Sequence, residues 1–330
     1  MSKKLYSTLK WKKYLKSRQR YQLRRTRERR SRRRGTVPLT RRQPHNLPFL
    51  TMTVPGNFSI IHNPADTIKF LREFRNLAQR NNLTLNLANV TQITVDAITA
   101  LIAEILSLGE KRLINGNNPS NEACRDLLIQ SGFFDHVRSR RPVASSQKGK
   151  IAPRKSHRVE GTTAKELIRI GTEAAFGSPH KSYPAYSALI ECMSNTHNHA
   201  TGMREQHGAE MWYSTVYGNA DNGSVSYSFL DTGVGIFRSA RLYSLKKLYN
   251  KLFRGEDHRH ILKDILLGRV ASRTGLPFRG KGLPGIYKSF RSGRIKSLII
   301  VSNDVYADVG NDDYRVLRMQ FPGTLLYWET

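Results

Sequence analysis

Positive charge is concentrated at the start of this 330-residue chain, and it limits which part of the chain can fold. Residues 1–45 contain 18 Lys or Arg and one acid, Glu28, so they carry +17 of the formal net charge of +30. Like charges at this density repel one another and leave too little apolar surface to bury. We therefore expect residues 1–47 to be a basic tail and the folded core to lie downstream.

Arginine dominates this tail, and its planar guanidinium group suits bidentate contacts with phosphate groups. A nucleic acid would gain affinity from such contacts through the release of counterions. An acidic protein partner or an anionic membrane surface would also complement residues 1–45, so these alternatives stay open.

The expected compartment of the protein can be inferred from its targeting signals and its cysteines. No apolar run approaches the roughly 20 residues that span a bilayer, and no apolar segment of a secretory signal follows the basic start. The two cysteines, Cys124 and Cys192, are far apart, which is more typical of a reducing compartment than of a disulfide scaffold. We expect a cytoplasmic protein without a transmembrane segment.

Residues 48–142 alternate between strand and helix patterns, which predicts a small α/β unit with a largely parallel sheet. The expected helices, identified by apolar residues at helical spacing, are 64–81, 95–111 and 121–137. The expected strands are 57–63, 83–90 and a short one within 112–119. Residues 143–160 are polar, basic and aperiodic, which indicates a linker between two domains.

This order of elements resembles STAS domains, the fold of anti-sigma-factor antagonists. The resemblance rests on "LTLNLANVTQITVDAITALIAEI", "NGNNP" and the helix ending in "SGFFDHV". STAS domains usually carry an Asp-Ser-Ser-Gly turn before the middle helix, and the second Ser accepts a phosphate. Thr94, Val95, Asp96 and Ala97 occupy that turn here, so an acid replaces the acceptor hydroxyl. We expect Asp96 to cap the helix.

The stretch "ALIECMSNTHNHA", residues 188–200, places several polar side chains on one expected helix. His197 and His199 are two residues apart and point to different faces, and Cys192 has no thiol partner near it, so the spacing does not suit zinc. Glu191, Asn195 and His199 are four residues apart and share a face. An amide oxygen suits Mg²⁺, which also binds phosphates, and a glutamate can take a proton from water.

A strand pattern downstream ends in Asp231-Thr232-Gly233-Val234-Gly235. Gly233 and Gly235 allow the backbone to turn sharply beside a flat ligand. A carboxylate at the end of the strand can accept a hydrogen bond from an exocyclic amine such as that of adenine. Asp231 is therefore a candidate for base recognition.

A second glycine-rich run, "RGKGLPGI", covers residues 279–286 and leads into another expected helix. Its glycines permit close approach of the backbone, and Lys281 adds positive charge. The N–H groups at the start of that helix can bind an anion such as a phosphate. The last expected strand, "PGTLLYWE", carries Thr324 within an apolar run.

These four motifs, in this order, resemble the GHKL family of ATPases and kinases, which share the Bergerat fold, an α/β two-layer sandwich. "ECMSNTHNHA" is similar to the N box, "DTGVGI" and "GKGLPGI" to the two glycine boxes, and "GTLLYWE" to the closing strand. The resemblance implies an ATP-binding domain at 161–330 with ATP and Mg²⁺ as cofactors. The spacing is most similar to that of the anti-sigma-factor serine kinases.

The resemblance also implies a role for each motif residue. Glu191 would be the general base, Asn195 the Mg²⁺ ligand and Asp231 the partner of the adenine amine, helped by Thr324 through water. His199 completes the face of Glu191 and Asn195, near the phosphates. The residues that would line the base or cradle the phosphates are Gly233, Gly235, Gly280, Lys281, Gly282, Leu283 and Gly285. A basic lid with two helices is expected over about 237–279.

We expect a regulatory ATPase that captures Mg²⁺-ATP and whose lid closure changes the binding of a partner. Two alternatives stay open: a serine or threonine kinase acting on a separate STAS-like protein, and a nucleic-acid-associated module in which ATP is a structural ligand. A homodimer, and a STAS-like or other protein partner, also stay open.

Overall fold

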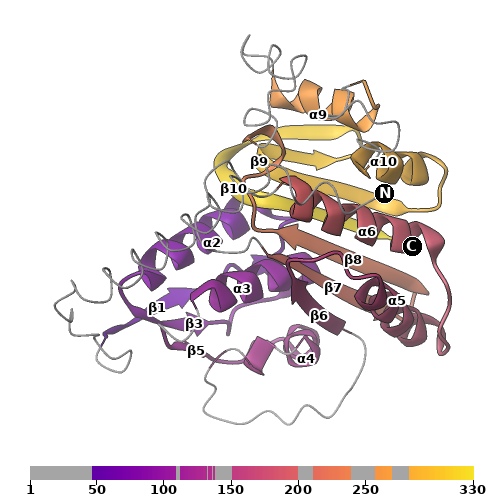
Figure 1. Cartoon of the computed structure of the whole chain (residues 1–330). Coiled ribbons are helices and arrows are strands. Elements are labelled where there is room, and N and C mark those ends of the chain that lie inside the picture. The colour runs from indigo at the N-terminus through magenta and orange to yellow at the C-terminus, as the bar shows by residue number, and fades with distance from the viewer. Residues whose placement is uncertain are drawn as a thin grey trace, which may run out of the picture. The chain divides into compact units, whose positions relative to one another are not determined.

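The computed structural model describes residues 47–108, 112–131, 133–135, 137, 151–199, 211–238, 257–269 and 282–330, of which 135, 151–155 and 197–199 are described by their backbone alone. Residues 47–330 form one compact unit of mixed α/β structure (Figure 1). Apart from Leu47, the predicted basic tail lies outside the described residues. None of the described helices combines the length and the hydropathy that crossing a bilayer requires.

A five-stranded antiparallel sheet forms the centre of the unit, in the order β6-β7-β8-β10-β9. Its strands are β6 (Ile151–Ser156), β7 (Trp212–Asn219), β8 (Ser224–Asp231), β9 (Lys296–Asp308) and β10 (Asp313–Glu329). Strand β6 falls within 143–160, so the linker prediction is wrong for residues 151–156. Pairing with β7 along its whole length holds this polar strand, and its edge position tolerates Pro153 because the outer side needs no hydrogen bond.

A three-stranded parallel sheet, β1-β3-β5, confirms the parallel arrangement predicted for 48–142. The strands of this region are β1 (Phe49–Thr53), β3 (Asn82–Asn86) and β5 (Ile114–Gly116), with a separate parallel pair of β2 (Asn57–Phe58) and β4 (Gln92–Ile93). Strand β1 was not predicted. The strand predicted over 57–63 ends at Phe58, because the Ser59 N–H and carbonyl both bond to Thr67 Oγ1, at 3.1 and 3.0 Å, and turn the chain into a helix.

Helices cover both faces of the five-stranded sheet (Figure 1). The described helices are α2 (Pro64–Ala78), α3 (Val95–Leu108), α4 (Glu122–Gln130), α5 (Gly161–Phe176), α6 (Tyr183–His199), α9 (His258–Leu266) and α10 (Gly282–Arg291), with a short 3₁₀ helix at Phe133–Asp135. Helices α5, α6, α9 and α10 pack on one face, which we call the α6 face. Helices α2 and α3 pack on the other, which we call the α3 face.

Strand alternation assigns the side chains of the sheet to these two faces. In β8, Tyr227 and Phe229 belong to the core of the α6 face, whereas Leu230 belongs to the core of the α3 face. In β10, Trp328 and Tyr327 divide in the same way. The sheet is therefore an interior layer, and the predicted domain at 48–142 supplies one of its two covers.

Polar contacts also join residues 48–142 to the five-stranded sheet. The hydroxyl groups of Thr99 in α3 and Thr215 in β7 lie 2.7 Å apart. The Tyr306 hydroxyl of β9 donates to the Ile61 carbonyl at 2.8 Å. All of these groups are buried, and buried polar groups need such partners. Residues 48–142 and the five-stranded sheet thus pack as one unit.

Two glycines allow α5 to lie directly on the sheet. A Cβ at Gly218 of β7 would lie 2.2 Å from the Gly171 carbonyl oxygen of α5. A Cβ at Gly171 would lie 2.5 Å from both Val216 Cγ2 and Val225 Cγ1. Separations this short do not occur between packed atoms, so any larger residue would displace the helix.

Gly218→Ala should lower the free energy of unfolding by about 3 kcal/mol, as overpacked core substitutions do. Urea unfolding followed by tryptophan fluorescence measures the change. Gly310→Ala is the matched control, because its Cβ would meet only ordinary contacts, the nearest at 3.4 Å from Asp308 Oδ1. We expect that control to change stability by less than about 0.5 kcal/mol. Equal effects of the two substitutions would contradict the close approach of α5.

Candidate functional site

Helices α6 and α10 bring together two of the predicted motifs. Helix α10 begins at Gly282, and a Cβ at this residue would lie 3.1 Å from Asn195 Nδ2 and 3.2 Å from Glu191 Oε2. Hydrogen at this position lets the start of α10 contact both side chains. Because N–H groups at a helix start attract anions, an anion bound there would face Glu191 and Asn195 together.

Burial shapes the chemistry of α6. Glu191 is partly buried, and this burial raises the pKa of its carboxyl group. Burial also raises the pKa of the neighbouring Cys192 thiol well above its usual value, and the carboxylates of Asp231 and Glu191 raise it further. The thiol therefore stays protonated near neutral pH and behaves as a small apolar residue. Helix α6 packs against β8, the strand that ends in Asp231.

Asp231 ends β8 and lies on the α6 face with Phe229, because side chains two residues apart share a face. Its strand neighbours are Thr324 of β10 and Trp212 of β7. The Gly233 N–H donates to its carboxylate at 2.8 Å. Burial raises the pKa of Asp231 to about 6, although hydrogen bonds from Gly233 and Thr324 lower it. At neutral pH the carboxylate is therefore mostly ionised and can accept a hydrogen bond.

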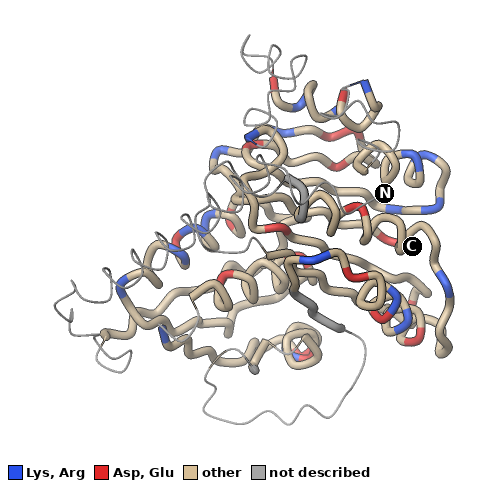
Figure 2. The backbone as a smooth tube through the Cα atoms, in the orientation of Figure 1, with Lys and Arg blue, Asp and Glu red and all other residues tan. Residues whose placement is uncertain are grey.

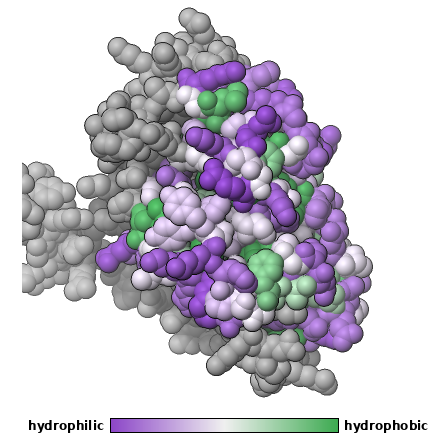
Figure 3. All heavy atoms as spheres, turned by 90° about the vertical axis from the view of Figure 1, so that its right-hand side faces the viewer, coloured by the Kyte–Doolittle hydropathy of each residue, from purple (hydrophilic) through white to green (hydrophobic). Residues whose placement is uncertain are grey.

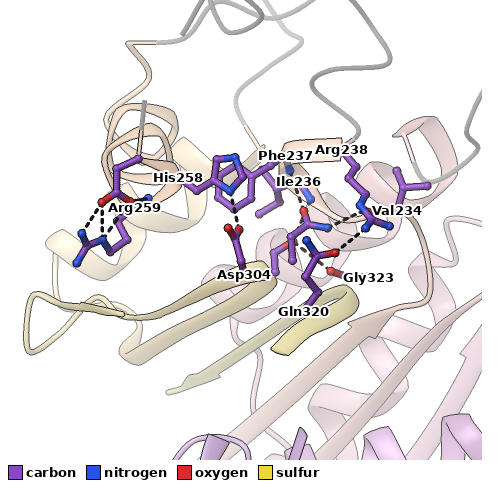
Figure 4. Close-up of polar contacts among 12 residues, drawn as sticks. Val234, Ile236, Phe237, Arg238, His258, Arg259, Asp304, Gln320 and Gly323 are labelled. Carbon is purple, nitrogen blue, oxygen red and sulfur yellow. Dashed lines mark hydrogen bonds and ion pairs between the residues drawn. The ribbon is translucent and has the colours of Figure 1, made fainter. Parts of the chain in front are cut away.

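Two buried residues of β9 that were not predicted, Ser302 and Asn303, hold the glycine turn after Asp231. Asn303 Nδ2 donates to the Val234 carbonyl at 2.9 Å, and Asn303 Oδ1 accepts from the Phe237 N–H at 3.1 Å. Ser302 Oγ accepts from the Ile236 N–H at 2.9 Å. Figure 4 labels Val234, Ile236 and Phe237 of this turn. Three backbone groups of the turn are thus fixed by two side chains.

Gly235 and the closing strand complete this clamp, which we call the Ser302–Asn303 clamp. Gly235 has a φ of +81°, and a Cβ there would lie 2.5 Å from Asn303 Nδ2. Ser302 Oγ donates to the Gly323 carbonyl at 3.1 Å and lies 3.1 Å from Thr324 Oγ1. The clamp therefore couples the glycine turn to the strand that carries Thr324. A signal for it exists in the sequence, where "SND" interrupts the apolar run "LIIVSNDVYA" of β9.

The described ends of the expected lid are anchored nearby. His258 Nδ1 of α9 lies 2.6 Å from Asp304 Oδ1, and the His258 ring stacks on Phe237 with centroids 4.4 Å apart (Figure 4). Arg238 donates to Gln320 of β10 (Figure 4). Helix α9 lies within the predicted lid, whereas residues 239–256 and 270–281 are outside the described residues. The contacts hold both described ends over β9 and β10.

The structure describes the surroundings of only some of the other predicted site residues. Gly280 and Lys281 lie outside the described residues, and His199 is described by its backbone alone. Leu283 is partly buried against the core of the α6 face. Gly285 is exposed, and a Cβ there would have no heavy atom within 4 Å, so protein packing does not require glycine at this position.

Asp96 lies in the first turn of α3, but its carboxylate accepts hydrogen bonds from another segment of the chain. It is completely buried, and its Oδ2 accepts from the N–H groups of Ile60 at 2.7 Å and Ile61 at 3.3 Å. Burial raises the pKa of its carboxyl group, while these hydrogen bonds and one from Thr94 lower it. The side chain thus joins the start of α3 to the turn between β2 and α2, and the predicted capping of α3 stays a prediction.

Among the described residues, no three His, Cys, Asp or Glu side chains gather into a metal-binding cluster. Comparison of the sequence with models of protein families gives no match, and comparison with curated proteins gives none either.

Asp231→Asn should stabilise the unliganded protein at about pH 7 by up to about 3 kcal/mol. The folded state holds the proton more tightly than the unfolded state, because burial raises the pKa from 3.8 to about 6. The stability that Asp231 contributes is therefore lost as pH rises from about 4 to about 6, and asparagine removes this loss while keeping an acceptor for Gly233. Urea unfolding at about pH 4 and pH 7 measures it. A variant whose gain does not grow between those pH values would contradict the buried carboxylate.

Proposed function

We propose that the protein binds Mg²⁺-ATP on the α6 face, beside α6, α10 and the end of β8, and hydrolyses it to control association with a partner. Glu191 is the general base that takes a proton from the attacking water. Asn195 offers a neutral oxygen to Mg²⁺, which screens the phosphate charge when bound. Asp231 accepts a hydrogen bond from the adenine amine, and Thr324 lies beside it.

The observation that carries this proposal is the contact of Gly282 with Glu191 and Asn195. A phosphate chain at the N-terminus of α10 would lie next to a carboxylate whose pKa is raised by burial and next to an amide oxygen. A base with a raised pKa is a stronger proton acceptor when it is ionised. Anion binding, a metal ligand and a base thus meet at one helix start.

The end of β8, at Asp231, supports recognition of the adenine base. Asp231 lies on the same face of the sheet as α6, and the Ser302–Asn303 clamp fixes the turn that follows it. A fixed turn lowers the entropy lost when a flat ligand binds against it. The buried Thr324 faces the same side, directly opposite Asp231 in the strand pairing.

The order of the motifs supports the same proposal, because it resembles that of the GHKL family. A helix layer on one face of an antiparallel sheet is compatible with the sandwich that this resemblance implies. The parallel unit at 48–142, which resembles STAS domains, contacts the reverse side of the same sheet. A nucleotide-dependent change in the sheet would therefore reach that unit directly.

Glu191→Gln tests the catalytic assignment. We expect ATP binding to stay within about threefold of wild type and phosphate release to fall by about 100-fold or more, since glutamine keeps the shape but not the base. Fluorescent-nucleotide titration and a phosphate-release assay measure the two quantities. Glu173→Gln, which removes an exposed acid paired with Arg169 on α5, is the control and should leave both unchanged.

Undiminished phosphate release by Glu191→Gln would contradict the proposal. Transfer of labelled phosphate from ATP to a STAS-like protein, without release to water, would replace hydrolysis by the kinase alternative.

The pH dependence of ATP binding tests Asp231. Affinity should fall as pH drops through about 6, because the protonated carboxyl group no longer accepts from the adenine amine. Calorimetric titration with a non-hydrolysable ATP analogue measures the profile, and Asp221→Asn in the exposed β7–β8 turn is the control. The analogue has its own titrating phosphate, so the deciding quantity is the difference between Asp221→Asn and Asp231→Asn. Identical pH profiles for these two variants would exclude Asp231 from the base site.

A further inference from the structure

Four cations gather where α10 ends and β9 begins. Lys288, Arg291, Arg294 and Lys296 lie within nine consecutive residues, and all four are exposed. Figure 2 shows the corresponding Lys and Arg segments at the end of α10 and along the turn into β9. We call these residues the α10–β9 basic patch. The patch is far in sequence from residues 1–45, which carry most of the remaining excess of positive charge.

Among the described residues, none of the four cations forms an ion pair, whereas Arg169, Lys263 and Arg315 each pair with an acid. Glu329 lies opposite Lys296 in the strand pairing, where its carboxylate accepts from Ser297 and Tyr327 and places one negative charge beside the four cations.

Helix stability, without any partner, accounts for two of the four cations. Lys288 and Arg291 lie in the last turn of α10, where cations interact favourably with the helix dipole. Arg294 and Lys296 lie beyond the helix, so this effect does not account for them. Arg294 is also held in place: its N–H donates to the Ser289 carbonyl at 3.0 Å and its Nε donates to Ser292 Oγ at 2.9 Å. A partner therefore meets a partly preorganised guanidinium group.

The lack of exposed large apolar side chains in residues 282–297 indicates what kind of partner the patch fits. The exposed large apolar side chains of the described chain are Phe49, Leu50, Leu77, Val159, Phe176, Tyr183, Leu267 and Val316, and none lies within residues 282–297. Figure 3, which views the side of the molecule at the right of Figure 1, shows mostly hydrophilic surface with small, separated apolar areas.

A surface that inserts into a membrane carries apolar residues, and a protein interface normally centres on buried aromatic or apolar anchors. A nucleic acid backbone requires neither, because its affinity comes from phosphate neutralisation and counterion release. We propose that the α10–β9 basic patch binds the phosphate backbone of a nucleic acid. This proposal is independent of ATP hydrolysis, because it rests on the opposite end of α10 from Gly282.

The test is salt-dependent binding of a labelled mixed-sequence oligonucleotide, single-stranded and duplex, to the full chain by fluorescence anisotropy. Replacing all four patch cations by alanine should reduce the slope of log affinity against log salt by about 3, from roughly 0.7–0.9 per phosphate contact. The control is Lys69→Ala, Arg72→Ala, Arg80→Ala and Lys165→Ala, which removes the same charge from exposed positions elsewhere. Its slope should stay at the wild-type value.

A slope that is unchanged in the patch variant, or reduced equally in the control, would overturn the proposal. A charge-preserving variant, Arg291→Lys with Arg294→Lys, should keep the wild-type slope, because the slope depends on charge. An unchanged circular-dichroism spectrum of the alanine variant shows that unfolding is not the cause of its loss. Binding to vesicles that contain anionic lipid is measured for the same variants. If the patch variant loses vesicle binding but keeps its oligonucleotide slope, the partner is a membrane surface.

Discussion

Burial of both faces of the five-stranded sheet is the constraint on which the other parts of the structure depend, because each set of helices has its apolar side directed at this sheet. Trp328 and Tyr327 are consecutive in β10, yet both are buried, one in each core. A sheet with such strands cannot face water on either side without exposing large apolar surface. The parallel unit at 48–142 therefore serves as the second cover of the sheet, through α2 and α3, as well as having its own strands.

The candidate site follows from the way the strands end beneath the α6 face. Alternation along β8 directs Asp231 toward α6, and β10 must approach β8 closely there, since a Cβ at Gly323 would lie 1.9 Å from the Asp231 carbonyl oxygen. The burial that raises the pKa of Asp231 to about 6 also weakens the unliganded fold. A carboxylate whose pKa burial raises at the end of a strand is a candidate for ligand binding, and Asp231 is such a group.

Much of this could be predicted from local patterns, because helical periodicity and glycine runs act within a few residues. The spacing of Glu191 and Asn195 placed them on one face, and the start of α10 at Gly282 agreed with its glycine run. Strands β1 and β6 escaped prediction because their partners, β3 and β7, are distant in sequence and supply the pairing that their own patterns do not signal. The Ser302–Asn303 clamp was not predicted for a similar reason. Its two residues hold a turn that lies about 70 residues earlier in the chain, and their own sequence does not indicate this contact.

Helix α10 relates the two proposals through its own electrostatics. Its N-terminal N–H groups carry partial positive charge and begin against Glu191 and Asn195, so they favour an anion directly. Its C-terminal carbonyl groups carry partial negative charge, which Lys288 and Arg291 offset, and those cations in turn favour an anion beyond them. A helix of ten residues is about 15 Å long, so two anions at its ends lie within one rigid element. If a nucleotide at the start of α10 changes the affinity of the other end for an anion, an anion bound at that end must change the affinity for the nucleotide by the same factor, because coupling between two binding sites is symmetric in free energy.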